Sequence, residues 1–217
     1  MIKDPEEIAA QLRLPHGERA KEITDFMEKA NGPMYDLALS PMTFAPGDSV
    51  LEIGPANGAF LNRIFEKENS IVYSGIDLSK DMVDEANNTH KALVASKAAS
   101  FVHGSVEEMP FESNSFNHIF TVNTLYFWPD VMKGFDEILR VLKRGGDFSI
   151  AIRSADTMKV LPFAAFGFRL YSEDELRSIM EKLPLSHFRI DSRNEKIKLP
   201  DGNPAELTNH CAFGVKA

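Results

Sequence analysis

Two carboxylates stand beside a short glycine-containing segment in the first half of the chain. The segment Val50 to Gly58 (VLEIGPANG) is an apolar run that leads directly into a turn, and Glu52 precedes Gly54 by two residues. Asp77 closes a second apolar run, in GIDLS. A strand that leads straight into a helix presents backbone N–H groups to a ligand, and an acid at the end of the next strand is the usual partner of ribose hydroxyls. The spacing therefore predicts a nucleoside-binding site.

Glu52 separates two classes of nucleoside ligand. A carboxylate beside the turn repels a pyrophosphate, by about 4 kcal/mol for unit charges about 4 Å apart at an effective dielectric of about 20, whereas it attracts an ammonium or sulfonium group. When the dinucleotide-binding pattern GxGxxG is aligned on Gly54, Ala56 and Ala59 stand where its second and third glycines belong, and the second glycine admits the pyrophosphate. The residues therefore favour a nucleoside without phosphates, such as S-adenosylmethionine, over a nicotinamide dinucleotide.

Composition narrows the class of partner. The chain has a net charge of −8 and no block of Lys and Arg, so no nucleic-acid partner is expected. No apolar run approaches the roughly 18 residues of a membrane span, and the N-terminus has acids where a signal peptide has a basic head. These features predict a cytoplasmic protein without a membrane partner. Cys211 is the single cysteine and no His-rich motif occurs, so no metal site is expected.

From Ser49 onward, short β-like runs alternate with longer helical patterns, as in βαβ units stacked around a mostly parallel sheet. The last two strand candidates follow each other without a helix between them, which predicts an antiparallel hairpin at the C-terminal end. The expected fold class is therefore α/β, with a Rossmann-like, seven-stranded, mostly parallel sheet and helices on both faces. Strands are predicted at 49–53, 71–76, 100–104, 116–122, 147–152, within 187–199 and at 210–216, and helices at 57–67, 129–143 and 172–182.

Particular residues are expected to set the ends of these helices. Pro129 suits the first turn of the helix at 129–143, and Gly145 and Gly146 are expected to stop it. Ser172 and Glu175 have the spacing of a capping box, which predicts the start of the last helix.

Residues 1–45 differ from the remainder of the chain. They predict two helices, around 5–12 and 17–30, followed by a connector that contains Gly32, Pro33, Pro41, Pro46 and Gly47. These residues are too few to bury a core alone. We therefore expect a helical cap, or lid, on the carboxyl edge of the sheet, which belongs to the same domain as the ligand-binding residues 46–217.

Several segments, in this order, resemble motifs of the class I S-adenosylmethionine-dependent methyltransferases, in particular the type 11-like small-molecule group that includes the ubiquinone and menaquinone C-methyltransferases. VLEIGPANG looks like the family's first motif and GIDLS like its ribose-binding second motif. FVHGSVEEMPFESNSFNHIF, LYFWPD and ILRVLKRGG look like later landmarks, so the likeness covers roughly residues 48–152. The resemblance implies a methyltransferase domain at 46–217 with S-adenosylmethionine as its cofactor.

The resemblance also implies roles for single residues. The glycine turn borders the methionine half of the cofactor, Glu52 reaches its amino group, Asp77 holds the ribose, and Leu78 with Met82 lines the adenine. Ser105 stands where the family often has an aspartate that accepts from the adenine amino group, so this chain departs from the pattern there. The implied cofactor-binding residues are Glu52, Gly54, Pro55, Ala56, Gly58, Asp77, Leu78, Met82, Ser105, Val106, Thr121 and Asn123.

The expected reaction is methyl transfer to a small, partly apolar acceptor by in-line displacement, which releases S-adenosylhomocysteine and needs no covalent enzyme intermediate. The alternatives are a nonenzymatic S-adenosylmethionine-binding protein and a nucleotide-dependent oxidoreductase. The sequence identifies neither the acceptor nor a general base; Tyr35 and Tyr126 are the candidates for a catalytic role. Tyr126 and Trp128 are expected on the acceptor side. Further aromatic residues form either an apolar acceptor pocket or a second packing cluster: Phe163, Phe166, Phe168 and Tyr171.

Overall fold

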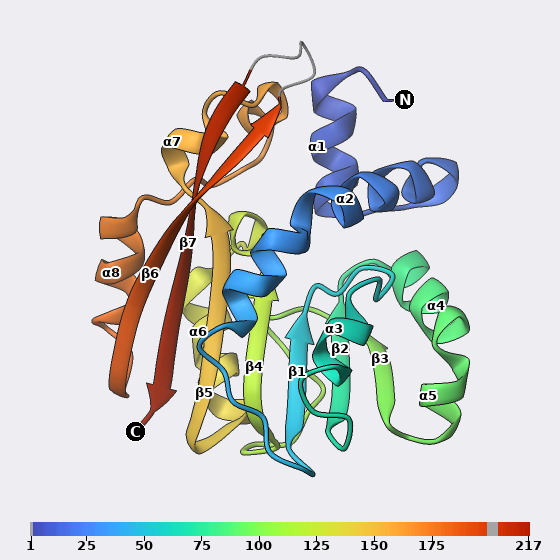
Figure 1. Ribbon diagram of the computed structural model, residues 1–217, viewed down its shortest axis with the longest axis vertical. Coiled ribbons are helices and arrows are strands. Elements are labelled where there is room, and N and C mark those ends of the chain that lie inside the picture. Colours follow the sequence, from blue (N-terminus) through green and yellow to red (C-terminus); the bar gives the residue numbers. More distant parts are fainter. Residues whose placement is uncertain (1, 199–203) are drawn as a thin grey trace.

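A computed structural model describes residues 2–198 and 204–217, and its centre is one seven-stranded sheet (Figure 1). The strand order is β3-β2-β1-β4-β5-β7-β6; neighbouring strands among β1 to β5 pair in parallel, and β7 pairs antiparallel with both β5 and β6. The predicted fold class and the C-terminal hairpin are therefore confirmed. The strands are β1 Ser49–Ile53, β2 Val72–Asp77, β3 Ala99–His103, β4 Phe116–Val122, β5 Leu142–Arg153, β6 Leu185–Lys198 and β7 Pro204–Lys216. Leu199, the last residue of one strand candidate, lies outside the described residues.

Two layers of helices cover the sheet. In β1, Leu51 and Ile53 belong to an apolar cluster with α6 and α8, whereas Val50 belongs to a cluster with α2, α3 and α4. Because side chains alternate between the two faces along a strand, the two sets of helices lie on opposite faces (Figure 1). The helices are α1 Pro5–Arg13, α2 Ala20–Leu39, α3 Leu61–Phe65, α4 Lys80–Thr89, α5 Lys91–Ala95, α6 Val131–Val141, α7 Ala155–Met158 and α8 Glu173–Met180, with 3₁₀ turns η1 Gly17–Arg19, η2 Leu125–Phe127 and η3 Pro162–Ala165.

The ends of α6 differ from the prediction. Asp130, not a residue before it, caps the helix, because its carboxylate accepts hydrogen bonds from the N–H groups of Met132 and Lys133. Pro129 therefore precedes the helix. Gly145 and Gly146 do not stop it either, since β5 has already begun at Leu142. The predicted capping box at the start of α8 is confirmed, with Ser172 and Glu175 each accepting from the other's backbone.

The helix predicted at 57–67 is shorter than expected, because its first residues form a turn. Ala56 and Gly58 have positive φ angles of 49° and 73°, a conformation that a right-handed helix excludes. Helix α3 therefore begins only at Leu61.

Helix α2 is longer than expected, because it runs through Gly32 and Pro33, which the sequence placed in a connector. Proline inside a helix removes one backbone hydrogen bond and bends the axis, and α2 changes direction part-way along its length (Figure 1). Beyond the bend, Met34, Ala38 and Leu39 are buried in an apolar cluster with residues of the sheet. Burial of this apolar face stabilises the second half of α2 despite the proline. Among the described residues, no helix is long and apolar enough to cross a bilayer.

Candidate functional site

The carboxyl ends of β1, β2 and β4 meet at the glycine turn. Gly54 has φ +76° and its N–H donates to the carbonyl of Ile76 at 2.8 Å, which joins the ends of β1 and β2. A side chain at Gly54 would overlap the methyl group of Thr124, which follows β4. The backbone at this position is therefore both left-handed and tightly covered, and only glycine meets both conditions.

Asp77 lies beside the glycine turn, as its spacing predicts. Its Oδ2 accepts from the N–H of Ala56 at 2.8 Å, and its Oδ1 accepts from the N–H of Ser79 at 2.8 Å. Burial raises the pKa of Asp77 above its ordinary value, and these two backbone N–H groups oppose the shift. One carboxylate thus connects the turn after β1 to the turn after β2 while it remains partly exposed.

Glu52 is much more deeply buried, with 2% of its surface exposed. The hydroxyl of Tyr35, on α2, donates to Oε1, and the hydroxyl of Tyr73, on β2, donates to Oε2 at 2.7 Å. Burial raises the pKa of Glu52 to about 7, although both tyrosine hydrogen bonds act in the opposite direction. The candidate Tyr35 is therefore a direct partner of the predicted acid.

Sequence reasoning missed Tyr73. The strand register contains the signal for it, because Glu52 pairs with Gly75 and residues two apart on a strand point to the same face. Gly75 has no side chain, and a Cβ there would stand 3.1 Å from the hydroxyl of Tyr73. The glycine therefore leaves the space through which Tyr73 reaches the carboxylate of Glu52.

The residues predicted at the adenine lie at the ends of β2 and β3. Leu78 is 51% exposed, whereas Met82 is buried. The N–H of Gly104 donates to the carbonyl of Asp77 at 3.0 Å, so the turn with Ser105 and Val106 follows β3 at the same edge of the sheet. Ser105 Oγ accepts from the N–H of Glu107 at 3.2 Å, and its hydroxyl hydrogen stays available for a ligand.

The predicted residues of β4 are tied to their surroundings on both sides. The hydroxyl of Thr121 donates to the carbonyl of Ile53 at 2.6 Å. Asn123, with φ +58°, donates through Nδ2 to Oδ1 of Asn31 on α2 at 3.1 Å. The end of β4 therefore contacts both the glycine turn and the cap helix, and Asn31 is a second residue that sequence reasoning missed.

The hydroxyl of Tyr126 is fully engaged by neighbouring groups. It accepts from the N–H of Arg153 at 2.5 Å and lies 3.1 Å from the carbonyl of Arg153 and 3.2 Å from Oδ1 of Asn123. Burial raises its pKa far above the ordinary value. A phenol that is buried, neutral and hydrogen-bonded to the main chain holds the end of β5 in place and is poorly suited to act as a base.

The aromatic residues after β5 pack against one another. The ring of Phe168 lies 4.6 Å from that of Phe127, 5.5 Å from Tyr126 and 5.7 Å from Phe163, measured between centroids. Phe166 instead is 41% exposed. Of the two alternatives for these residues, the packing cluster describes Phe163 and Phe168. Two surface hollows of about 280 and 250 Å³ share Arg169, Ile179 and Lys182 beside α8 and include no residue of the glycine turn.

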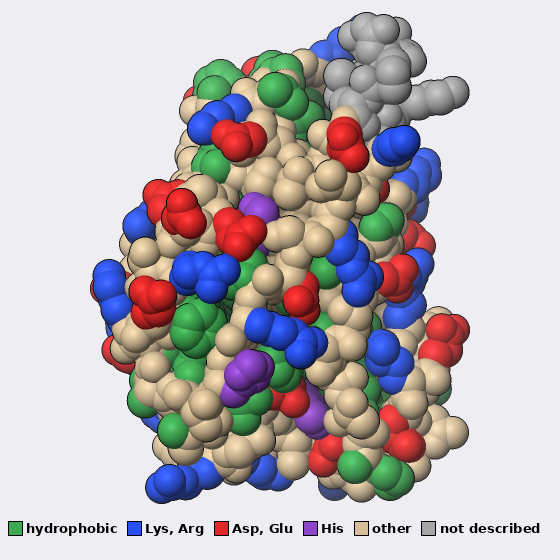
Figure 2. Space-filling model, turned by 60° about the vertical axis from the view of Figure 1, so that its left-hand side comes forward, with side chains coloured by type: hydrophobic (Ala, Val, Ile, Leu, Met, Phe, Trp, Pro, Cys, Tyr) green, Lys and Arg blue, Asp and Glu red, His purple; other side chains and the backbone are tan. Residues whose placement is uncertain are grey.

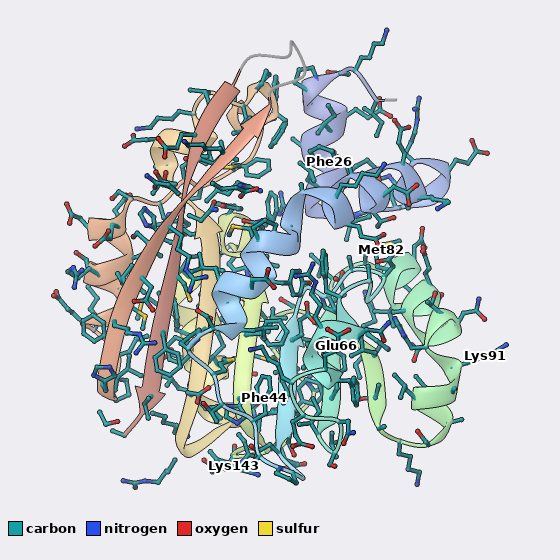
Figure 3. The ribbon with its side chains drawn as sticks, viewed as in Figure 1. Phe26, Phe44, Glu66, Met82, Lys91 and Lys143 are labelled. Carbon is teal, nitrogen blue, oxygen red and sulfur yellow. The ribbon has the colours of Figure 1, made fainter. Side chains whose placement is uncertain are left out.

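The N-terminal residues cover the carboxyl ends of the strands, and polar contacts hold them there (Figure 1). The carbonyl of Pro15 accepts from the hydroxyl of Ser79 at 2.5 Å, and the N–H of Gly17 donates to Asp81 at 2.9 Å. On α2, the carbonyl of Ala30 accepts from Nη2 of Arg153 at 2.9 Å. In the side-chain view, Met82 lies just below α2 at the start of α4 (Figure 3), and its N–H donates to Oγ of Ser79 at 3.3 Å. The cap therefore touches the ends of β2 and β5 at once.

Residues 51–150 match the family model described as a methyltransferase domain. The chain is 29% identical over 132 residues to the uncharacterized methyltransferase YdaC of Bacillus subtilis, an alignment that covers 60% of this chain and 71% of that protein. It covers between 31% and 57% of several other curated relatives. This chain is therefore similar to the class I S-adenosylmethionine-dependent methyltransferases, and residues 51–150 carry the likeness.

Solved structures agree on the fold. A putative methyltransferase in complex with the Haloferax volcanii Trm112 activator superposes with a TM-score of 0.71, at 22% identity and over 99% of both chains. The [4+2]-cyclase SpnF superposes with a TM-score of 0.65, at 15% identity, over 87% of this chain and 82% of that one.

The cofactor of this methyltransferase family is S-adenosylmethionine, and the residues at the turn fit it. Asp77 offers carboxylate oxygens at the end of β2, Glu52 places a second carboxyl group beside the turn, and a Cβ on Gly54 would fill the space that Thr124 occupies. Asp77 would suit the ribose of either ligand class, but the buried carboxyl group of Glu52 does not suit a pyrophosphate, so the nucleotide-dependent oxidoreductase is set aside. No group of three metal-ligating side chains occurs among the residues that the structure describes.

We predict that Glu52 lowers stability at neutral and alkaline pH. Its pKa is about 7 in the folded chain and near 4.3 in an unfolded one, so the unfolded state ionises first as the pH rises, and stability is lost between these values. Glu52→Gln should therefore raise the free energy of unfolding by up to about 3 kcal/mol at about pH 8, and by much less near pH 4. Urea denaturation of both proteins at the two pH values measures this. A difference that does not change with pH would contradict it.

Proposed function

We propose that this protein transfers a methyl group from S-adenosylmethionine to a small, partly apolar acceptor by in-line displacement, with release of S-adenosylhomocysteine. The pair of carboxylates at the glycine turn is the observation that supports this most directly. When bound, the sulfonium supplies an already activated methyl group. The chain's own task is then to align the acceptor and to exclude water, so no covalent intermediate and no dedicated nucleophile is needed.

Asp77 is proposed to hold the ribose. A carboxylate has about four lone-pair positions, and the N–H groups of Ala56 and Ser79 occupy two of them. Asp77 can therefore accept from both ribose hydroxyls without releasing the glycine turn. Leu78, next along the chain and half exposed, is proposed to cover the adenine, with Met82 beneath it.

Glu52 is proposed to face the positive charges of the cofactor. The ammonium and sulfonium favour an ionised carboxylate, so binding should draw the Glu52 equilibrium away from its protonated form. Tyr35 and Tyr73 already donate to both oxygens and stabilise that anion. The remaining predicted residues, Pro55, Ala56, Gly58, Val106, Thr121 and Asn123, are proposed to shape the cavity mainly through their backbone.

Asp77→Ala should weaken binding of S-adenosylhomocysteine by about ten- to a hundredfold, because each hydrogen bond to a charged group contributes about 1.5–3 kcal/mol and about 1.4 kcal/mol is a factor of ten. Calorimetry on wild type and variant measures this, with NAD as the control ligand. Asp77→Asn keeps one accepting oxygen and should lose less affinity. A wild-type protein that binds NAD in preference would refute the methyltransferase function, whereas undiminished affinity in a folded Asp77→Ala would refute only the ribose assignment.

The cap, residues 1–45, is proposed to act as a lid. Its outer part makes polar contacts to the remainder at Pro15, Gly17, Ala30 and Asn31, and none of its described residues belongs to the two core clusters, whereas the part of α2 beyond Pro33 is core. We expect S-adenosylhomocysteine to slow amide hydrogen exchange in residues 17–31 and to leave 34–39 unchanged. Equal exchange of residues 17–31 with and without the ligand would mean that the cap is a fixed scaffold.

The acceptor is proposed to be a small molecule in the cytoplasm. The net charge is −8, and acidic and basic side chains are interspersed over the face seen in Figure 2, so no basic track for a nucleic acid is apparent there. Phe127, in the turn that follows β4, is only partly buried, and Phe166 is 41% exposed, so these two rings offer apolar surface to such an acceptor.

The second candidate is a protein that binds the cofactor without transferring a methyl group. The cyclase SpnF shares this fold, so the fold alone does not decide the reaction. Incubation with methyl-labelled S-adenosylmethionine and a panel of small hydroxyl-, amine- and carbon-nucleophile acceptors should yield a labelled product. If tight cofactor binding is accompanied by no transfer to any acceptor of the panel, the nonenzymatic alternative is favoured.

A further inference from the structure

Four polar groups below the glycine turn form a continuous chain of hydrogen bonds. Thr121 Oγ1 lies 2.6 Å from the carbonyl of Ile53 and 2.5 Å from Thr124 Oγ1, which in turn lies 3.2 Å from the indole Nε1 of Trp128. All four residues come from the ends of β1 and β4 and from the turn that follows β4. These hydrogen bonds therefore connect Ile53, the residue before Gly54, to the indole of Trp128, which lies after the turn that follows β4.

The direction of every bond in this chain follows from its two ends. A carbonyl only accepts and an indole N–H only donates, while each hydroxyl has a single hydrogen. Thr121 must give its hydrogen to Ile53, so Thr124 must give its own to Thr121, and Trp128 donates to Thr124. Replacing the hydroxyl of Thr124 therefore leaves both an indole N–H and a threonine oxygen without their partners.

Thr124 also contacts the glycine turn through its methyl group. A Cβ added to Gly54 would collide with that methyl, so Thr124 packs directly against the Cα of Gly54. On the other side, Trp128 is buried against Gly134, where a Cβ would come within 2.7 Å of the indole ring, and its ring centroid is 5.8 Å from that of Phe135. The indole of Trp128 therefore packs against α6, while its N–H donates to Thr124, the residue that covers Gly54.

We propose that Thr124 is a positioning residue for cofactor binding. Its methyl group packs against Gly54 and so fixes the position of the glycine turn relative to β4. Its hydroxyl holds that methyl group in place through the hydrogen bonds to Thr121 and Trp128. This inference rests on the proposed function, because it assigns the turn to the cofactor. It also makes Trp128, the single tryptophan of the chain, a reporter of the turn, since a shift of Gly54 changes the hydrogen bond at its indole.

Two substitutions separate the hydroxyl from the methyl. Thr124→Val keeps a methyl near Gly54 and removes the hydroxyl, so that the indole N–H of Trp128 and Oγ1 of Thr121 lose their partner. It should weaken binding of S-adenosylhomocysteine by about tenfold, at the lower end of the cost of unpaired buried polar groups. Thr124→Ser keeps the hydroxyl chain. We expect the ligand to change Trp128 emission in wild type and in Thr124→Ser, and to leave it unchanged in Thr124→Val; an unchanged emission in wild type on ligand binding would overturn the link between Trp128 and the turn.

The experiment titrates S-adenosylhomocysteine into wild type, Thr124→Val and Thr124→Ser, and follows both calorimetric affinity and Trp128 fluorescence. A merely structural threonine would lower the melting temperature of Thr124→Val and leave affinity and emission response as in wild type; this result overturns the proposal. If wild type binds no S-adenosylhomocysteine, the proposed function itself fails, and the inference fails with it. Normal binding by wild type together with an unaltered Thr124→Val overturns the role of Thr124 alone.

A double substitution tests the packing contact independently of the hydroxyl. Gly54→Ala should weaken ligand binding strongly, because of both the collision with the methyl group and the left-handed backbone. Adding Thr124→Ser removes the methyl and should recover several-fold of that loss, while the backbone strain persists. Equal affinity of Gly54→Ala and the double variant would show that Thr124 does not set the position of the turn.

Discussion

The buried carboxyl group of Glu52 is the interaction on which the arrangement of the site depends. A carboxylate without partners cannot be taken out of water except at a large cost in free energy, so each of its oxygens needs a donor. One donor comes from β2, within the sheet, but the other, Tyr35, belongs to α2. Both oxygens of Glu52 therefore have a donor only when the second half of α2 is docked on the sheet. This part of the N-terminal segment is consequently integral to the domain.

The consequence for the cap is a division at Gly32 and Pro33. Beyond these residues α2 belongs to the core, and before them no described residue of α2 joins a core cluster, while Ala30 and Asn31 each make one hydrogen bond to a residue at the end of β5 or β4. Proline leaves one carbonyl of the preceding turn without its helical partner, so the two halves are less strongly coupled than in an uninterrupted helix. One helix can therefore combine a rigid second half, which supplies the Tyr35 hydrogen bond to Glu52, with a more loosely held first half.

The sequence predicts the strands and the glycine turn correctly, because both are set by residues that are close together in the chain. Alternating apolar residues identify the strands, and the positions of Glu52, Gly54 and Asp77 along them place three groups at one sheet edge. The predicted ends of α6 were wrong by a few residues. At its start, Asp130 provides the capping signal, where the prediction had relied on Pro129. The partners Tyr73, Asn31 and Arg153 were not predicted, because their roles arise from register and from packing between elements far apart in the chain.

A sheet of this kind binds phosphates at the same edge in other proteins, because the turn after the first strand presents backbone N–H groups there. In this chain one of the nearest such groups, that of Ala56, already donates to Asp77, and a second acid is buried immediately below. The engaged N–H of Ala56 and the buried carboxyl group of Glu52 both lower the positive electrostatic potential at the turn. In the function proposed for this chain, Glu52 would face the cationic end of the ligand and Asp77 its ribose hydroxyls. The preference against a phosphate ligand then follows from the buried Glu52 and the engaged N–H of Ala56, and it requires no change of fold.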